Sequence, residues 1–348
     1  MTDDTVTTTP GGAPGAPSGA APTASHRRAN PFQAALHAHP SLGPLMVLIL
    51  AVVIFGLINT RFFALANLSI MLQEVAVIGL LALGQTIIIL TAGIDLSVGA
   101  AMILAQMVMA GLAINSGVPV VPALIIGLVI GLICGGINGV LVTRFHVPPF
   151  IATLGTLGVF TAAGLKYANG QTLTPKPGNL LLWTGQIISL GAFKITTGVL
   201  IMLVLYIVIG YVLGRTAWGK HVYAVGDDPE ATRLVGIRST QLLISVYLVA
   251  GLIYAVAAWV QIGRVGDAST DISSTLNLDS ITAVVIGGVS LFGGRGVVLG
   301  TLFGALIVQV FQTGLALAGV EELYQQLAEG VLVIAAVSVD QWIRRVRR

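Results

Sequence analysis

The segment Arg215–Thr240, RTAWGKHVYAVGDDPEATRLVGIRST, separates two long apolar stretches and holds 7 of the chain's 31 charged residues. Within it, Asp227-Asp228-Pro229-Glu230 predicts a helix start, because Asp caps helices, Pro fits the first turn and acidic side chains suit the positive helix end. Gly236, just after Leu234-Val235, predicts the helix stop. We therefore expect one short capped helix on a charged loop between membrane-type segments. An ordinary solvated loop is the alternative.

The composition around this loop is that of an integral membrane protein. Of 348 residues, 55% are hydrophobic and only 9% are charged, with a mean hydropathy of +0.94. Soluble domains contain about 25% charged residues. The 43 glycines suit close helix packing in a bilayer. Cys134 is the single cysteine, so no intrachain disulfide can form.

Ten apolar stretches approach the length that a bilayer requires, about 20 residues. The fold class is accordingly all-α, a polytopic membrane protein of about ten transmembrane helices. The eighth stretch is too short to cross unaided, so it is either a half-helix or a span that uses part of the preceding loop. The predicted spans are Leu42–Ile58, Leu68–Leu90, Leu96–Ile114, Val120–Val142, Phe150–Tyr167, Ile195–Leu213, Leu242–Ile262, Ile281–Leu291, Val297–Ala318 and Leu323–Ile343.

The distribution of basic residues predicts the orientation. With the N-terminus inside, 12 Lys and Arg residues fall on the cytoplasmic side and 5 on the outer side, which follows the positive-inside rule. Both termini and the 215–240 loop are then cytoplasmic. Two longer polar stretches, Lys166–Lys194 and Gly263–Ser280, face outward, where a substrate-delivering partner could dock.

Residues 1–40 differ from the rest of the chain. Their first part, MTDDTVTTTPGGAPGAPSGAAPTAS, is rich in Thr, Pro, Gly and Ala and has no aromatic residue. Such a segment cannot bury enough surface to fold, so we predict a disordered cytoplasmic tail. It is not a signal peptide, because Arg27 and Arg28 come late and the apolar run that follows is long enough to stay. The membrane domain is predicted to be 41–348.

Glycines spaced four apart predict tight helix contacts. Gly127, Gly131, Gly135 and Gly139 share one face of a predicted span, where a second backbone can approach closely. Gly300 and Gly304 repeat the spacing in a later span. We interpret both sets as helix-packing positions.

The stretch Gly93–Gly99, GIDLSVG, places an acid in an apolar region. A carboxylate there is costly unless it is capped, paired or hydrated. Asp95 or Ser97 is predicted to cap the following helix, and the alternative is that Asp95 touches a transport path.

Other polar residues within spans bear on the kind of solute carried. The acids Glu74, Glu329 and Asp340 are scattered, and no basic residue lies deep in a span, which makes a poor proton relay for an ion-coupled carrier. Uncharged polar residues are more numerous, and such donors and acceptors suit a neutral polyhydroxyl solute; for any single residue, a hydrogen bond between helices is the favoured alternative. They are Gln73, Gln85, Gln106, Asn138, Thr153, Thr156, Gln309, Gln312, Gln325 and Gln326.

Several enzyme signatures are missing from the sequence. It has no G-x-x-x-x-G-K-[ST] phosphate loop, no H-E-x-x-H and no G-x-S-x-G. The five histidines show no metal-ligand spacing. We expect no catalytic residue, no cofactor and no metal site.

Four ordered motifs resemble the permease subunits of ribose-type sugar ABC importers. They are GQTIIILTAGIDLSVGA (Gly84–Ala100), NGVLVTRFHVPPFIATLGT (Asn138–Thr156), GDDPEATRLVGI (Gly226–Ile237) and LDSITAVVIGGVSLFGGRG (Leu278–Gly296). The resemblance covers Ser41 to Arg348. RTAWGKHVYAVGDDPEA, SVYLVAGLIYAVAAW and DQWIR look most like the fructose-type permeases.

This resemblance implies a permease that works as a pair with a second copy or a homologue in a bacterial inner membrane. Two cytoplasmic ATP-binding subunits would drive it, and an external binding protein would deliver a monosaccharide. The family's coupling helix falls on Asp228–Gly236. The residues expected to couple to the ATPase are Asp227, Asp228, Pro229, Glu230, Arg233, Leu234 and Gly236. The candidates for the translocation path are Gln85, Asp95, Asn138, Thr153, Thr156 and Gln309. An ion-coupled sugar or polyol carrier that needs no ATPase is the alternative.

Overall fold

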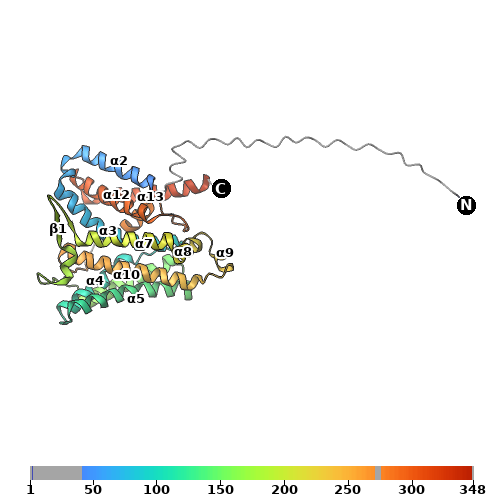
Figure 1. Ribbon diagram of the computed structural model, residues 1–348, viewed down its shortest axis with the longest axis horizontal. Helices are drawn as coiled ribbons and strands as arrows, with labels where there is room; N and C mark the ends of the chain where they lie inside the picture. Colours follow the sequence, from blue (N-terminus) through green and yellow to red (C-terminus); the bar gives the residue numbers. More distant parts are fainter. Residues whose placement is uncertain (1, 3–40, 271–275, 347–348) are drawn as a thin grey trace.

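The computed structural model describes Thr2, residues 41–270 and residues 276–346 (Figure 1). The predicted disordered tail therefore lies almost wholly outside the described residues. The elements in chain order are α2 (Leu42–Ile58), η1 (Thr60–Phe63), α3 (Leu65–Leu90), α4 (Val98–Ile114), α5 (Val120–Arg144), α6 (Pro149–Ala168), η2 (Leu180–Gly185), β1 (Ile187–Leu190), β2 (Phe193–Thr196), α7 (Thr197–Arg215), α8 (Ala217–Asp227), α9 (Pro229–Leu234), α10 (Ser239–Val265), α11 (Leu276–Ile286), α12 (Val298–Leu317) and α13 (Glu322–Val346).

The predominantly helical fold predicted from the sequence is confirmed, and each of the ten apolar stretches overlaps a helix. Within the described part of the chain, six helices are long and apolar enough to cross a membrane: α3, α5, α6, α7, α10 and α12. Three shorter apolar helices, α2, α4 and α11, accompany them. The predicted number of ten spans is therefore not established.

The largest differences from the sequence prediction are the position of α11, a hairpin before α7, and α8, an 11-residue helix in the charged loop that was expected to hold only one short helix. Helix α11 begins at Leu276 and ends at Ile286, five residues before the predicted range on each side. Its 11 residues span about 16 Å, half a bilayer core, which fits the half-helix interpretation. The polar stretch before α7 contains an antiparallel hairpin, in which Ile187 of β1 pairs with Thr196 of β2. The sequence analysis did not predict this hairpin.

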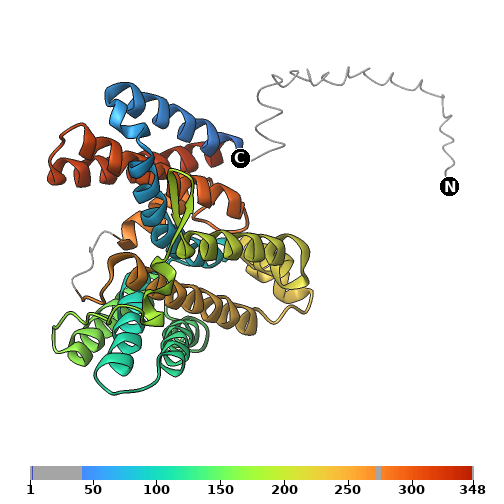
Figure 2. The ribbon, with the colours of Figure 1, turned by 60° about the vertical axis from the view of Figure 1, so that its left-hand side comes forward.

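The helices form two groups around a central set (Figure 2). Helices α2, α12 and α13 gather on one side, and α4, α5 and α6 lie on the other, with α3, α7 and α10 between them. Helix α3 is the most enclosed, since every residue from Val75 to Leu90 is buried. Its position in the centre explains why its sequence is apolar on all faces.

The two ends of the bundle are distinct (Figure 1). One end holds the β1–β2 hairpin, and the other holds α8, α9 and the last turns of α13. Glycines bring the backbones of α5 and α10 together between these ends. A Cβ added at Gly131 would lie 2.4 Å from the Gly251 carbonyl oxygen, and one at Gly135 would lie 2.1 Å from the Tyr247 oxygen. Because larger α5 numbers meet smaller α10 numbers, the two helices run antiparallel.

The remaining glycines of the predicted set also face neighbouring helices. Gly139 packs on Ile244 of α10, whereas Gly127 faces the Met109 side chain of α4. In α12, a Cβ at Gly300 or Gly304 would lie 2.1 Å from the Gly287 oxygen or 1.8 Å from the Ala283 oxygen, respectively. The half-helix α11 and the loop after it are thus held against α12 at backbone distance.

Candidate solute cavity and coupling helix

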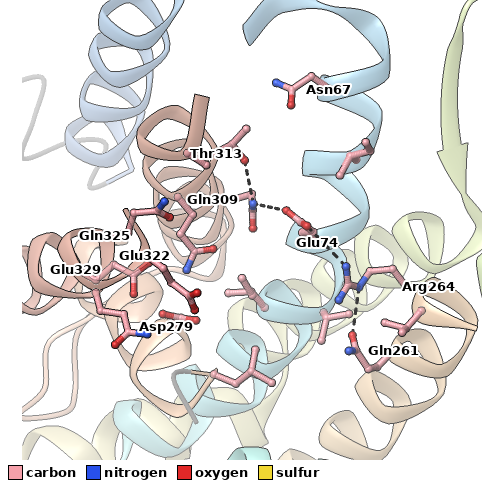
Figure 3. Close-up of a pocket in the computed structure, with 18 of the residues that line it drawn as sticks. Asn67, Glu74, Gln261, Arg264, Asp279, Gln309, Thr313, Glu322, Gln325 and Glu329 are labelled. Atoms are coloured by element: carbon pink, nitrogen blue, oxygen red, sulfur yellow. Dashed lines mark hydrogen bonds and ion pairs between the residues drawn. The ribbon is translucent and has the colours of Figure 1, made fainter. Parts of the chain in front are cut away.

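A polar cavity of about 830 Å³ lies between the two groups of helices, toward the hairpin end of the bundle (Figure 3). Its walls come from α3, α4, α10, α11, α12, α13 and the loop after α10. Pockets for small molecules fall in the range of about 300–1,000 Å³. The cavity is therefore large enough for a solute of monosaccharide size.

The centre of the cavity is a chain of three polar side chains from three helices. Glu74 of α3 accepts a hydrogen bond from Gln309 Nε2 of α12, and its other oxygen lies 3.8 Å from Arg264 Nη1 of α10 (Figure 3). Arg264 Nε also donates to Gln261 Oε1 at 3.2 Å, and Gln309 Nε2 donates to Thr313 Oγ1 at 3.1 Å. These bonds fix the side chains around an open space.

Two glutamine oxygens at this cavity have no hydrogen-bond partner within the described chain. Gln106 of α4 is 1% exposed and Gln309 is 3% exposed, yet Oε1 of each is unpaired. Buried polar atoms are normally paired, because an unmade hydrogen bond costs about 1–3 kcal/mol. Both oxygens are inaccessible to solvent, so they lie behind the wall of the cavity rather than on its open surface.

A second polar cluster is closed. Asp95 Oδ1 accepts from Ser97 N at 2.8 Å and from Ser97 Oγ at 2.6 Å. Asn138 Nδ2 donates to Ser97 Oγ at 2.8 Å, and Thr156 Oγ1 donates to Asn138 Oδ1 at 2.7 Å. Thr153 Oγ1 accepts from Leu96 N at 3.1 Å. All five side chains are buried, so the cluster ties the start of α4 to α5 and α6.

The predicted path residues are thus divided between two places. Asp95, Asn138, Thr153 and Thr156 join the closed cluster together with Ser97, and Gln85 Oε1 accepts from Tyr254 OH at 3.3 Å between α3 and α10. Of the six candidates, only Gln309 lines the cavity. The predicted capping of α4 by Asp95 or Ser97 is not found. Asp95 Oδ1 accepts from Ser97 N, which precedes the helix, whereas Gly99 N in the first turn of α4 donates to Asn277 Oδ1 of α11 at 2.8 Å.

Several cavity residues were absent from the sequence-based candidates. Arg264 was counted only as an outer basic residue, because no local pattern links it to Glu74, 190 positions away. Asp279 was placed in a loop, since α11 was expected to begin at Ile281, and Gln261 lies near the end of a predicted span. Gln309 and Thr313 are four positions apart and so share one face of a helix, and this spacing was the one local pattern that could have indicated the cavity.

The helix predicted in the charged loop is present as α9. Asp228 Oδ1 accepts from Glu230 N at 3.0 Å and from Ala231 N at 2.9 Å, and Pro229 occupies the first turn. Gly236, with φ of 86°, follows its end. Leu234 and Val235 are 88% and 76% exposed, so the tip presents an apolar surface beside a capped, charged helix.

Helix α8 connects this tip to the bundle through a glycine contact. A Cβ at Gly226 would lie 1.8 Å from the Leu90 oxygen and 2.6 Å from Gly294 N, while Gly294 N itself donates to Leu90 O at 2.9 Å. Tyr223 OH donates to Gly296 O at 2.9 Å, and burial raises the pKa of this phenol, which keeps it a donor. These contacts connect α8, which directly precedes α9, to the loops after α3 and α11.

Comparison with known proteins identifies the protein family to which this chain belongs. The family described as "Branched-chain amino acid transport system / permease component" matches residues 67–337. The chain belongs to this permease family. No solved structure matches it.

The curated relatives are import permeases for sugars. The chain is 46% identical to the fructose import permease protein FrcC of Rhizobium meliloti over 89% of this chain and 88% of the relative. It is 38% identical to the ribose import permease protein RbsC of Bacillus subtilis, covering 86% and 92%. A galactose/methyl galactoside import permease, MglC of Haemophilus influenzae, is 31% identical, covering 81% and 88%.

Proposed function

We propose that this chain is the membrane subunit of an ATP-driven importer for a monosaccharide, in which ATP is hydrolysed on separate subunits. The relationship to the fructose permease, which spans almost the full length of both chains, is the main support. The relatives are named for three different sugars. A ketohexose is the first substrate to test, followed by a pentose and an aldohexose.

The coupling site is proposed to be α9. An ATPase subunit must bind a permease at a surface that protrudes, is rigid and is connected to the transport path. Helix α9 is capped at both ends, exposes Leu234 and Val235, and is joined through Gly226 to the loops after α3 and α11. Asp227, Asp228, Glu230 and Arg233 provide the charged contacts around this apolar tip.

The proposed orientation in the membrane rests on the basic residues at the α9 end of the bundle. The ends of α5 and α7 and the start of α10 share the α9 end, and Arg144, Arg215 and Arg238 are found there. The positive-inside rule then favours a cytoplasmic location for this end and for the end of α13. The hairpin end and the cavity face outward, where a sugar-binding protein would dock. A second copy or a homologue completes the permease.

Charge reversal in α9 tests this function. We expect Glu230→Arg with Arg233→Glu to leave the fold and the membrane insertion intact, because both side chains are exposed, while uptake of labelled fructose, ribose or galactose falls at least about tenfold. The measurement is ATP-dependent uptake by the importer reconstituted in vesicles with its ATPase and binding protein.

The matched control is Glu230→Asp with Arg233→Lys, which keeps both charges at the same two positions of α9. Normal uptake and ATPase binding in the α9 variant would contradict the coupling assignment. Sugar uptake by the purified chain alone, driven by a proton or sodium gradient, would favour the ion-coupled carrier instead.

A further inference from the structure

Helix α8 is attached to the bundle at both of its ends. At its start, Trp218 Nε1 donates to Ser245 Oγ of α10 at 2.8 Å, and a Cβ added at Gly219 would lie 2.2 Å from the Leu213 oxygen of α7. These two contacts hold the start of α8 against the long helices. Its 11 residues span about 16 Å, so the other end of α8 lies well beyond these contacts.

The far end of α8 meets α9 and the loop that follows α11, residues 287–297. Thr232 of α9, which is 4% exposed, donates from Oγ1 to the Ala224 oxygen of α8 at 3.0 Å, so the two short helices are held together. Tyr223 hydrogen-bonds the 287–297 loop, and Gly226 packs directly against its backbone. Because closely packed groups transmit strain, the loop must follow a movement of the end of α8.

Helix α11 extends from the 287–297 loop to the cavity. Leu276 and Asp279, both in the first turn of α11, line the cavity. Between them, Asn277 Oδ1 accepts from Gly99 N at the start of α4 at 2.8 Å. The half-helix thus touches the cavity at one end and is continuous at its other end with the loop that α8 contacts.

Helix α3 also meets the end of α8, at Leu90, but it is enclosed on all sides from Val75 to Leu90. A shift of α3 would disturb packing along most of its length. Helix α11 is less than half as long, and the loop after it holds Gly288 and Gly296 at φ of 80° and 146°. Glycine adopts such conformations at little cost, and hinges consist of a few residues of this kind. Helix α11 and its loop are therefore better able than α3 to follow α8.

We propose that α11 is the element that carries a movement of α9 to the cavity, and that Tyr223 and Gly226 are the positioning residues through which α8 moves it. The proposal rests on the proposed function, because α9 must be the surface that the ATPase binds. It adds a route from α9 through α8, the 287–297 loop and α11. A force on α9 that turns α8 about its attached start shifts the loop, and α11 then displaces the cavity wall at Leu276 and Asp279.

Two substitutions weaken the contact between α8 and the loop. Tyr223→Phe removes the hydrogen bond and keeps the ring, and Gly226→Ala adds a methyl group where the Leu90 oxygen leaves no room. The importer is reconstituted with its ATPase and binding protein and supplied with labelled fructose, ribose or galactose. We expect uptake per ATP hydrolysed to fall about fivefold in Tyr223→Phe and at least about tenfold in Gly226→Ala.

The matched controls make the same substitutions at exposed or open positions of α7. They are Tyr211→Phe, at a side chain that is 65% exposed, and Gly210→Ala, where a Cβ meets nothing within 4 Å. We expect ATPase binding to stay within about twofold of wild type in Tyr223→Phe, because the exposed surface of α9 is unchanged. A merely structural loss would lower ATPase binding and uptake together.

A thiol in α11 measures the movement of the cavity wall. In a Cys134→Ala background, Leu276→Cys places a thiol on the α11 side of the cavity, and Ile70→Cys places one on the α3 side. The rate of modification by a membrane-impermeant thiosulfonate is measured with and without a non-hydrolysable ATP analogue bound to the ATPase. We expect the analogue to change the rate at Leu276→Cys at least about threefold more than at Ile70→Cys, and Tyr223→Phe to remove about half of this difference or more.

Equal effects of the analogue at the two thiols would overturn the role of α11. Normal uptake per ATP in Tyr223→Phe, or a loss of ATPase binding in that variant, would overturn the role of the α8 contact, and this test does not depend on Gly226→Ala folding. A wild-type importer without ATP-dependent uptake of any of the three sugars, or normal uptake after charge reversal in α9, would instead contradict the proposed function.

Discussion

Two polar regions of the same bundle contrast sharply. Around Asp95, carboxylate, amide and hydroxyl groups bond one another in a closed cluster that joins α4, α5 and α6. Around Glu74, the same kinds of group line an open cavity and leave two glutamine oxygens unpaired. The presence of an acid within the apolar bundle therefore does not by itself show what that acid does. The two regions differ in their hydrogen bonding: the polar side chains around Asp95 bond one another, whereas two glutamine oxygens near Glu74 have no partner in the described chain.

The two regions also differ in how closely the backbones of their helices approach one another. Beside the closed cluster, α5 and α10 meet through glycines, with no room for a methyl group. At the cavity, long polar side chains from α3, α10 and α12 line an open space between the helices (Figure 3). We call the first region the frame and the second, which is proposed to bind solute, the binding region.

The largest effect is expected from filling the glycine contact. Gly135→Ala would place a Cβ 2.1 Å from the Tyr247 carbonyl oxygen, so a helix must shift, at a cost of about 3 kcal/mol. Thermal unfolding of the purified protein in detergent measures the loss. Gly155→Ala in α6 is the control, since a Cβ there meets nothing within 4 Å. Equal unfolding temperatures for the two variants would show that the α5–α10 contact is not rigid.

A smaller loss is expected from opening the closed cluster. Asp95→Ala leaves Ser97 N and Ser97 Oγ without their acceptor, at a cost of about 2 kcal/mol, whereas Asp95→Asn keeps an acceptor oxygen and loses less. Thermal unfolding ranks the three proteins. If Asp95→Ala kept full stability but abolished uptake, Asp95 would belong to the transport path rather than to the frame.

The sequence predicted the frame better than the cavity, for physical reasons. Apolar stretches, caps and fourfold glycine spacing are local patterns, and they located every long helix and the α9 cap. The cavity depends on residues far apart in the chain: Glu74 meets Gln309 across 235 positions. Side-chain amides occur in both regions, and only the tertiary arrangement distinguishes Gln309, whose oxygen is unpaired, from Asn138, whose oxygen and nitrogen both have partners.

The β1–β2 hairpin was missed because its strands are only four residues each, and its alternation of polar and apolar side chains is too short to detect. Helix α11 was misplaced by five residues for a related reason. Asp279 and Ser280 interrupt the apolar run, so hydropathy places the helix start after them, although both are buried inside it. Hydropathy scores assume that polar residues lie outside a span, and Asp279 and Ser280 are polar residues buried within the helix.

The smallest effect is expected from the ion pair at the cavity. Glu74 and Arg264 lie 3.8 Å apart with side chains 35% and 28% exposed, so solvent screens them and their coupling free energy should be about 0.5 kcal/mol. A double-mutant cycle with Glu74→Gln and Arg264→Gln, followed by thermal unfolding, gives this value. The same cycle with Ser97→Ala and Asn138→Ala should give a larger coupling, because both side chains are buried and bonded to each other. A Glu74–Arg264 coupling above that of the buried pair would mean that the cavity is dry and closed, and the distinction between frame and binding region would fail.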